Sequence, residues 1–212
     1  MANEIKTEAK PSDFMFTPSV RTAQQELGSS ELISRLESRD HWKSTLSDQQ
    51  LEFIKGRDSF YLGTADKQGK PYIQHRGGHK GFIQLEGNSC LWFPDFSGNQ
   101  QYISIGNLSE NNQAFIFFMD YANKRRLKLW GRAIVLNKES ERFKALVVPD
   151  QHNVERIIRF EIDVLDENCR QHIPTRYSEV ELSQQLALLS TENLLLKNKV
   201  NQLELALKKF GE

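Results

Sequence analysis

Alternation of hydrophobic and polar residues in the middle of the chain predicts an antiparallel sheet. Arg126–Ala133 and Arg159–Val164 alternate with a period of two, which places the apolar residues of each strand on one face. Further short segments are rich in aromatic and β-branched residues, and Asp66–Gly69 and Glu86–Asn88 between them indicate tight turns. We expect strands at 60–64, 71–75, 82–85, 90–93, 114–119, 126–133 and 159–164. With a helical stretch near 139–146, the pattern favours a mainly β, α+β fold built on a closed or nearly closed barrel.

The longest apolar run in this region is Ala114–Met119. It is too short to span a membrane and is typical of a strand that is buried on both faces. We therefore expect it at the centre of the sheet.

The segments before the sheet have a different pattern. Residues 1–20 show little apolar periodicity and contain two prolines, which predicts a flexible tail. Residues 21–56 have helical periodicity, and Ser30 and Ser47 each precede a helical pattern as expected N-caps. The predicted organisation is a tail at 1–20, a helical segment at 21–56, a barrel at 57–176 and a coiled coil at 177–212.

The C-terminal segment carries a heptad repeat of leucines. Leu182, Leu189, Leu196 and Leu203 recur every seven residues as d positions, and Phe210 continues the series. The a positions are then Leu186, Asn193, Val200 and Leu207. A single Asn in an apolar seam favours two parallel strands in one register. In such a pair Glu192 faces Lys197 of the partner, and Lys199 faces Glu204. We expect self-association through a coiled coil at 182–210, and the alternative is an amphipathic helix packed on its own barrel.

A basic-zipper DNA-binding protein would need a continuous basic helix immediately before the seam. Here Ile173–Thr175 contains a helix-breaking proline, and Glu179–Glu181 is acidic. Binding of DNA by this route is therefore not expected.

Charge and composition restrict the partners further. The 212 residues include 28 basic and 28 acidic side chains, so no overall field attracts nucleic acid or an anionic membrane. Two cysteines, Cys90 and Cys169, are too few for a disulfide framework, and the first residues lack the apolar segment of a signal peptide. These features predict a cytoplasmic protein that binds neither nucleic acid nor membranes.

Two loops that follow predicted strands could bind an anion. His75–Gly81 combines Arg76 with three glycines, and glycine lets backbone N–H groups approach a ligand closely. Phe93–Gln101 offers small polar residues in a turn that leads toward Asn107. Taken singly, each loop could equally be a solvent-exposed turn.

Taken together and in order, these segments resemble the pyridoxamine 5′-phosphate oxidase-like superfamily of FMN-binding split barrels. The resemblance is carried by 60–65, 71–78, 93–99, 106–108, 117–121, 127–133 and 168–174, and it excludes the zipper. It implies an antiparallel FMN-binding split β-barrel and a homodimer with FMN sites at the interface. Gly98-Asn99 stands where the oxidase has an Arg-Lys pair, and the oxidase's Arg-x-x-x-Leu-Lys strand is missing after Arg76, which argues against pyridoxamine phosphate as the substrate.

The resemblance also implies which residues bind the cofactor. Arg76, Gly77 and Gly78 would lie near the flavin, 97–100 would bind its phosphate, and Lys80 or Arg132 would supply further charge. The complete set is His75, Arg76, Gly77, Gly78, Lys80, Pro94, Asp95, Ser97, Gly98, Asn99, Gln100, Asn107 and Arg132.

The expected function is an FMN-dependent oxidoreductase of unknown substrate, with NAD(P)H as a candidate reductant. The alternatives are a non-catalytic flavin-binding redox sensor or FMN carrier, tethered to partners by its coiled coil, and a scaffold that keeps only the coiled-coil function. If acid–base chemistry is needed, His172 is a candidate because imidazole titrates near neutral pH, with Cys169 beside it and His75 as the other histidine. Cys169 and His172 are too few for a closed zinc site, so no metal is expected.

Overall fold

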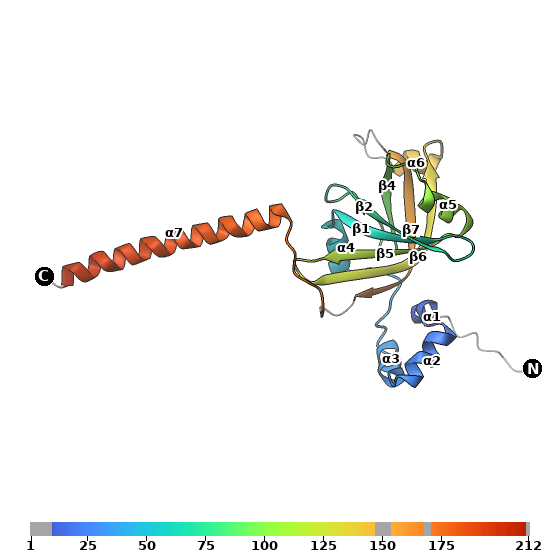
Figure 1. The fold of residues 1–212 in the computed structure, drawn as a ribbon, viewed down its shortest axis with the longest axis horizontal. Coiled ribbons are helices and arrows are strands. Elements are labelled where there is room, and N and C mark those ends of the chain that lie inside the picture. Colours follow the sequence, from blue (N-terminus) through green and yellow to red (C-terminus); the bar gives the residue numbers. More distant parts are fainter. Residues whose placement is uncertain (1–9, 147–153, 168–170, 211–212) are drawn as a thin grey trace, which may run out of the picture. The chain divides into compact units, whose positions relative to one another are not determined.

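The computed structural model describes residues 10–146, 154–167 and 171–210. The chain divides into a larger unit, Met1–Asp120 with Arg125–Arg170, and a smaller one, Tyr121–Lys124 with Gln171–Glu212. The described part of the larger unit contains one antiparallel sheet and six helices, and that of the smaller unit contains one long helix (Figure 1).

The described strands form a seven-stranded sheet with the order β2-β1-β5-β6-β7-β4-β3. Their bounds are β1 Ser59–Ala65, β2 Pro71–Gly77, β3 Gln84–Glu86, β4 Cys90–Phe96, β5 Gln113–Asp120, β6 Arg125–Asn137 and β7 Val154–Glu167. The helices are α1 Pro11–Met15, α2 Pro18–Glu26, α3 Ser30–Glu37, α4 Asp48–Lys55, α5 Ile103–Glu110, α6 Glu141–Leu146 and α7 Glu179–Phe210. The predicted α+β class and antiparallel sheet are confirmed.

The centre of the sheet is β6, and the expectation that 114–119 would occupy it is wrong. β6 has thirteen residues and pairs with β5 on one side and β7 on the other. In β5 only alternate residues such as Ile116 and Phe118 are buried, whereas Phe115 and Phe117 are half-buried. The second apolar face of this strand lies on the outer surface of the sheet. A continuous apolar run in the sequence does not distinguish such a strand from one that is buried on both faces.

Helices replace part of the expected tail. α1 and the first turn of α2 lie within residues 11–20, where Pro11 and Pro18 each begin a helix. Proline is well suited to the first turn because its missing N–H would have no helical partner there. Residues 1–9 lie outside the described part of the chain.

The N-cap at Ser47 is confirmed. Its hydroxyl accepts a hydrogen bond from the N–H of Gln50, and the Gln50 side chain accepts one from the N–H of Ser47. The cap expected at Ser30 falls one residue earlier, at Ser29, whose hydroxyl instead bonds the carbonyl of Gln24. α4 then directs Phe53 and Ile54 into the core.

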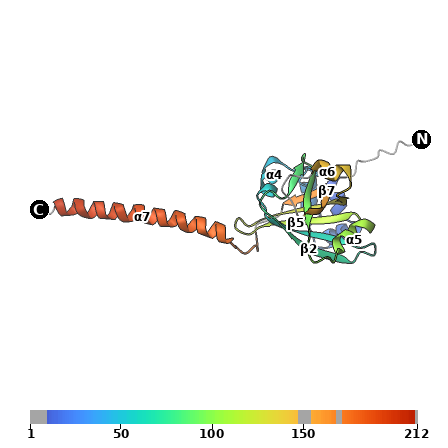
Figure 2. The same ribbon diagram turned by 90° about the horizontal axis from the view of Figure 1, so that it is seen from above.

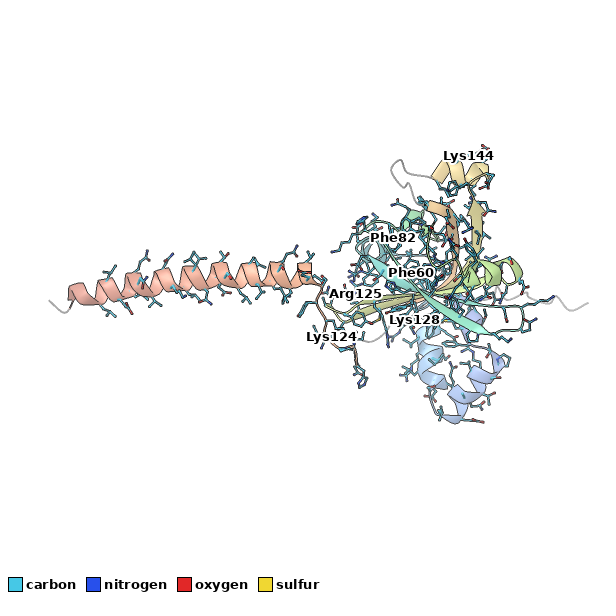
Figure 3. The ribbon with its side chains drawn as sticks, turned by 45° about the horizontal axis from the view of Figure 1, so that its top comes forward. Phe60, Phe82, Lys124, Arg125, Lys128 and Lys144 are labelled. Carbon is cyan, nitrogen blue, oxygen red and sulfur yellow. The ribbon has the colours of Figure 1, made fainter. Side chains whose placement is uncertain are left out.

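The core lies inside the curved sheet and is rich in aromatic residues. Phe60 of β1 stacks on Phe82 at 5.9 Å between ring centroids (Figure 3). Phe60 also contacts Phe93 of β4 edge-on at 4.8 Å and Phe118 at 5.4 Å. Since β1 and β4 lie near opposite ends of the strand order, these contacts fill the interior between the two halves of the sheet.

Helix α7 is 32 residues long and unbroken (Figure 2). It begins after Ser178, whose hydroxyl accepts the N–H of Glu181 while the Glu181 carboxylate accepts the N–H and hydroxyl of Ser178. This reciprocal cap explains why the helix starts at Glu179, five residues after Pro174. None of the described helices is long and apolar enough to cross a membrane.

Gly131 occupies the irregularity in pairing between β6 and β7. A Cβ added there would lie 2.0 Å from the carbonyl oxygen of Glu161 and 2.8 Å from the Phe160 ring. We expect Gly131→Ala to lower the free energy of unfolding by about 3 kcal/mol, because backbone at the centre of the sheet must move. Gly106→Ala in α5 is the control: its Cβ meets nothing within 4 Å, so stability should stay equal or rise. Chemical denaturation measures both, and equal stabilities for the two variants would contradict this account.

Candidate functional site

A polar cavity of about 210 Å³ lies where β2 and β4 approach the N-terminus of α5. The loop 97–102, which joins β4 to α5, forms one wall, and the inward side of β2 forms another. The lining residues are Tyr72, Gln74, Arg76, Asp95, Phe96, Gly98, Asn99, Gln100, Gln101, Tyr102, Ile103, Ser104, Ile105 and Glu155.

The loop holds an unusual backbone conformation. Gln100 and Tyr102 have φ values of 58° and 52°, in the left-handed region that residues other than glycine and asparagine seldom adopt. The N–H of Gln101, between them, is bound to the side-chain oxygen of Asn99. Strained residues of this kind concentrate at ligand sites, where the surrounding structure imposes the conformation.

The N-terminus of α5 borders the same cavity. Its N-cap, Tyr102, makes no side-chain cap, and the first turn contains no acidic residue. Ile103, Ser104 and Ile105 of that turn line the cavity. Uncapped N–H groups at a helix N-terminus carry partial positive charge and favour an anion. The hydroxyl of Ser104, which is buried, donates to Gln74 at 2.9 Å and ties the helix to β2.

Ionic contacts cross the cavity and close the barrel. Arg76 of β2 donates to Asp95 of β4, and Arg156 of β7 donates to the second oxygen of Asp95 at 3.2 Å. Because β2 is an edge strand and β4 is next to the opposite edge, Asp95 links the two ends of the sheet. Arg156 also donates to Glu155 at 2.8 Å.

Two further details describe the electrostatics. Burial opposes the charge of Arg156, but its hydrogen bonds to Asp95 and Glu155 outweigh that effect and raise the pKa of its guanidinium. The charges of the two arginines and two carboxylates cancel. The Nε of Arg76 is buried and has no hydrogen-bond partner among the described residues. A buried donor without a partner is costly unless a ligand satisfies it.

A second, apolar cavity of about 580 Å³ lies against the outer side of β1, β2 and β5. Phe115, Phe117 and Trp130 contribute aromatic rings, and the half-exposed Tyr61 and largely exposed Ile73 lie on the same side. Tyr72 lines both cavities, so the polar site and the apolar one are adjacent.

The family model described as Pyridoxamine 5′-phosphate oxidase matches residues 46–167, which include all seven strands and α5. The chain belongs to this family. The match covers the barrel, the polar cavity and the lining of the apolar cavity except Phe14, and it excludes the N-terminal helices α1–α3 and the helix α7.

Solved structures with a similar fold come from several bacteria. HupZ of Group A Streptococcus is 15% identical, with a TM-score of 0.47, 62% of this chain covered and 100% of that one. HutZ, a heme storage protein of Vibrio cholerae, is 18% identical, with a TM-score of 0.43 and coverage of 56% and 90%. An FMN-binding protein of Syntrophomonas wolfei is 15% identical, with a TM-score of 0.41 and coverage of 71% and 95%. No curated protein matches the chain.

Five of the residues expected to bind the cofactor line the polar cavity of this family member: Arg76, Asp95, Gly98, Asn99 and Gln100. The carboxylate of Asp95, which was expected to bind the cofactor, forms ion pairs with Arg76 and Arg156. The paired glycines of the first loop do not line the cavity. A Cβ at Gly78 would lie 2.6 Å from the Phe82 ring, so that glycine is required for packing.

The remaining expected cofactor residues lie elsewhere. His75 is exposed and contacts Tyr61 on the outer face, Lys80 and Ser97 are exposed and absent from the lining, and Pro94 is buried within β4. Asn107 donates to Thr64 at 3.0 Å. Arg132 pairs with Asp163 at 3.0 Å on the surface.

The proposed catalytic pair stays a prediction. His172 is exposed, with a left-handed φ of 62°, and Cys169 lies outside the described residues. Within the described ranges, no group of three or more histidine, cysteine or acidic side chains could hold a metal ion.

Several lining residues escaped the sequence reasoning. Gln74 and Tyr72 could have been found, because they share a face of β2 with Arg76 by simple alternation. Glu155 could not, since its place depends on the register in which β7 pairs with β4.

Replacing Asp95 by Asn should lower the free energy of unfolding by about 3 kcal/mol, because two largely buried guanidinium groups would lose their shared counter-charge. Asp163→Asn is the matched control: it removes the carboxylate that pairs with half-exposed Arg132 and should cost less than about 1 kcal/mol. Urea unfolding at neutral pH compares them. A cost for Asp95→Asn no greater than that of Asp163→Asn would show that the barrel does not depend on this bridge.

Proposed function

We propose that this protein binds FMN, with the phosphate in the polar cavity and the flavin ring along the apolar one. The observation that carries the proposal is the adjacency of the two cavities through Tyr72. One end offers unsatisfied hydrogen-bond donors and the other offers aromatic surface. A planar ring joined to a phosphate matches this division, and membership of the family favours the same ligand.

At the phosphate end, neutral donors would provide most of the binding. The loop 97–102 presents amide side chains, α5 presents its uncapped first turn, and Arg76 presents a free Nε. Because the charges of Arg76 and Arg156 are already balanced by Asp95 and Glu155, net positive charge contributes little. This arrangement is consistent with the absence of the oxidase's Arg-Lys pair at Gly98-Asn99.

At the ring end, a second copy of the chain would complete the site. Tyr61 and Ile73 are 38% and 69% exposed beside the apolar cavity, and a contiguous apolar surface of this kind usually marks an interface. A homodimer formed through the outer face of β1, β2 and β5 would cover these residues and enclose the ring between the subunits.

Bound FMN would supply hydride or electron transfer, and the residues of the chain would orient it and exclude water. The carboxylates nearest the polar cavity are held by arginines and are poorly suited to move protons. We therefore propose an oxidoreductase that uses the chemistry of FMN itself, with NAD(P)H as a candidate reductant and a cytoplasmic location. The alternative is a flavin sensor or carrier without turnover. Loss of visible flavin absorbance on anaerobic addition of NAD(P)H would favour the oxidoreductase, and no loss with any biological reductant would favour the alternative.

FMN should bind more tightly than riboflavin, which lacks the phosphate, and more tightly than FAD, whose added nucleotide would need a further pocket beyond 97–100. Arg76→Ala should weaken FMN by about 1.5–3 kcal/mol through loss of a charge-assisted hydrogen bond, and should leave riboflavin affinity unchanged. Calorimetry with the three flavins and with hemin tests this.

The riboflavin measurement guards against misfolding of the variant, since a collapsed site would lose both ligands. Tighter binding of FAD or hemin than of FMN would contradict the proposal. An unchanged FMN affinity in Arg76→Ala would remove Arg76 from the phosphate site.

The family match leaves α7 unexplained, and we propose that this helix pairs in parallel with α7 of a second copy. The described seam side chains, Leu182, Leu186, Leu189, Asn193, Leu196, Val200, Leu203 and Leu207, are all exposed. A row of exposed leucines at a and d positions, with one Asn, is the arrangement expected of an unpaired coiled-coil strand. The side chain of Phe210, the last expected d residue, lies outside the described part.

Asn193→Leu should raise the melting temperature of α7 and broaden its assembly to trimers, tetramers or mixed registers, because the buried amide that selects two parallel strands is lost. Thermal melts by circular dichroism and masses by light scattering measure the two effects. If the variant matches the wild type in both and the isolated 178–212 peptide is an unfolded monomer, the seam is not a coiled coil.

A further inference from the structure

The side of α7 opposite its seam carries no charge over six turns. Between residues 184 and 205 the outer face, defined by the b, c and f positions, consists of Gln184, Ala187, Leu188, Thr191, Leu194, Leu195, Asn198, Asn201, Gln202 and Leu205. All of these residues are exposed. The charged residues in the same span are Glu192, Lys197, Lys199 and Glu204, and each occupies an e or g position beside the seam. Charged residues occupy b and c positions only beyond this span, at Glu181, Lys208 and Lys209.

A solvent-exposed helix face normally carries charged residues, whereas here the outer face carries none between residues 184 and 205. The outer positions of a two-stranded coil normally carry most of its charged residues, since only they stay in water. Here four leucines, Leu188, Leu194, Leu195 and Leu205, are 60–72% exposed and separated only by amides, Ala and Thr. Pairing through the seam cannot cover them, because they point away from it. The outer face therefore needs a second partner surface.

We propose that the outer face binds the outer face of another α7 pair of the same chain. An identical face is a suitable partner because, between residues 184 and 205, it brings no like charges together. Asn and Gln side chains both donate and accept hydrogen bonds, so amides can pair with the amides of a second copy. A partner selected by charge would find no charged side chain on this face between residues 184 and 205. The inference rests on the coiled coil proposed above.

The symmetry of the pair determines what assembly follows. In a parallel two-stranded coil the two outer faces lie on opposite sides, so an outer-face contact leaves one face of each pair free. Such association is not closed. Open-ended association of this kind should produce assemblies of two, three or more α7 pairs. The average mass of these assemblies should rise with protein concentration.

Adjacent leucines provide matched variants of the full chain. Leu195 lies on the outer face and Leu196 on the seam, and their exposures, 64% and 56%, are similar. We expect the wild type to show dimers and larger even-numbered species in sedimentation velocity. Leu195→Glu should hold the mass at the dimer while the helical signal is kept. Leu196→Glu should lose both the larger species and the melting transition of α7.

The outcomes separate the two proposals. If Leu196→Glu keeps the helical melt, the coiled coil itself is wrong. If Leu196→Glu abolishes the melt but the wild type stays a dimer at every concentration, only the outer-face proposal fails. It also fails if Leu195→Glu forms the same larger species as the wild type.

Discussion

The barrel and its polar cavity depend on the carboxylate of Asp95. It accepts a hydrogen bond from Arg76 of β2, a strand that the sheet order places far from β4, and another from Arg156, its cross-strand partner on the neighbouring strand β7. Aromatic packing of Phe60 on Phe93 fills the interior between the same halves, but apolar contacts have little directional preference. The paired hydrogen bonds fix how the two edges meet. They thereby set the width of the cavity that loop 97–102 and α5 complete.

The same bridge changes how an anion could be held. A cluster of unpaired cations would attract phosphate strongly and would repel itself when empty. Here the charges cancel, and under the proposed function backbone N–H groups and amide side chains would do most of the binding. Dipoles fixed by strained loop residues such as Gln100 and Tyr102 need little rearrangement when a ligand arrives. The fold can therefore be stable without its ligand and still be ready to bind it.

Sequence patterns revealed the local features of this protein and missed those that depend on tertiary pairing. The Ser47 cap, most of the strands and the long C-terminal helix follow from short-range periodicity and could be predicted. The exact place of Ala114–Met119 in the sheet could not be predicted, because a strand with a half-buried outer face has the same sequence pattern as a strand buried on both faces. The role of Asp95 was equally hidden, since its partners are 19 and 61 positions away. Arg76 meets it through barrel closure, and Arg156 meets it through the register of β7 with β4. Gly78 looked like part of an anion loop, although its missing side chain makes room for Phe82.

Pro94, one of the residues expected to bind the cofactor, lies in β4 opposite Ile157. β3 covers β4 only as far as Trp92, so among the described strands the rest of β4 has a neighbour on one side alone. An exposed strand edge can recruit strands from other molecules and start aggregation. Proline has no N–H to donate and interrupts such a ladder at the point where cover ends. Pro94 would therefore weaken any pairing of this stretch of β4 with a further strand.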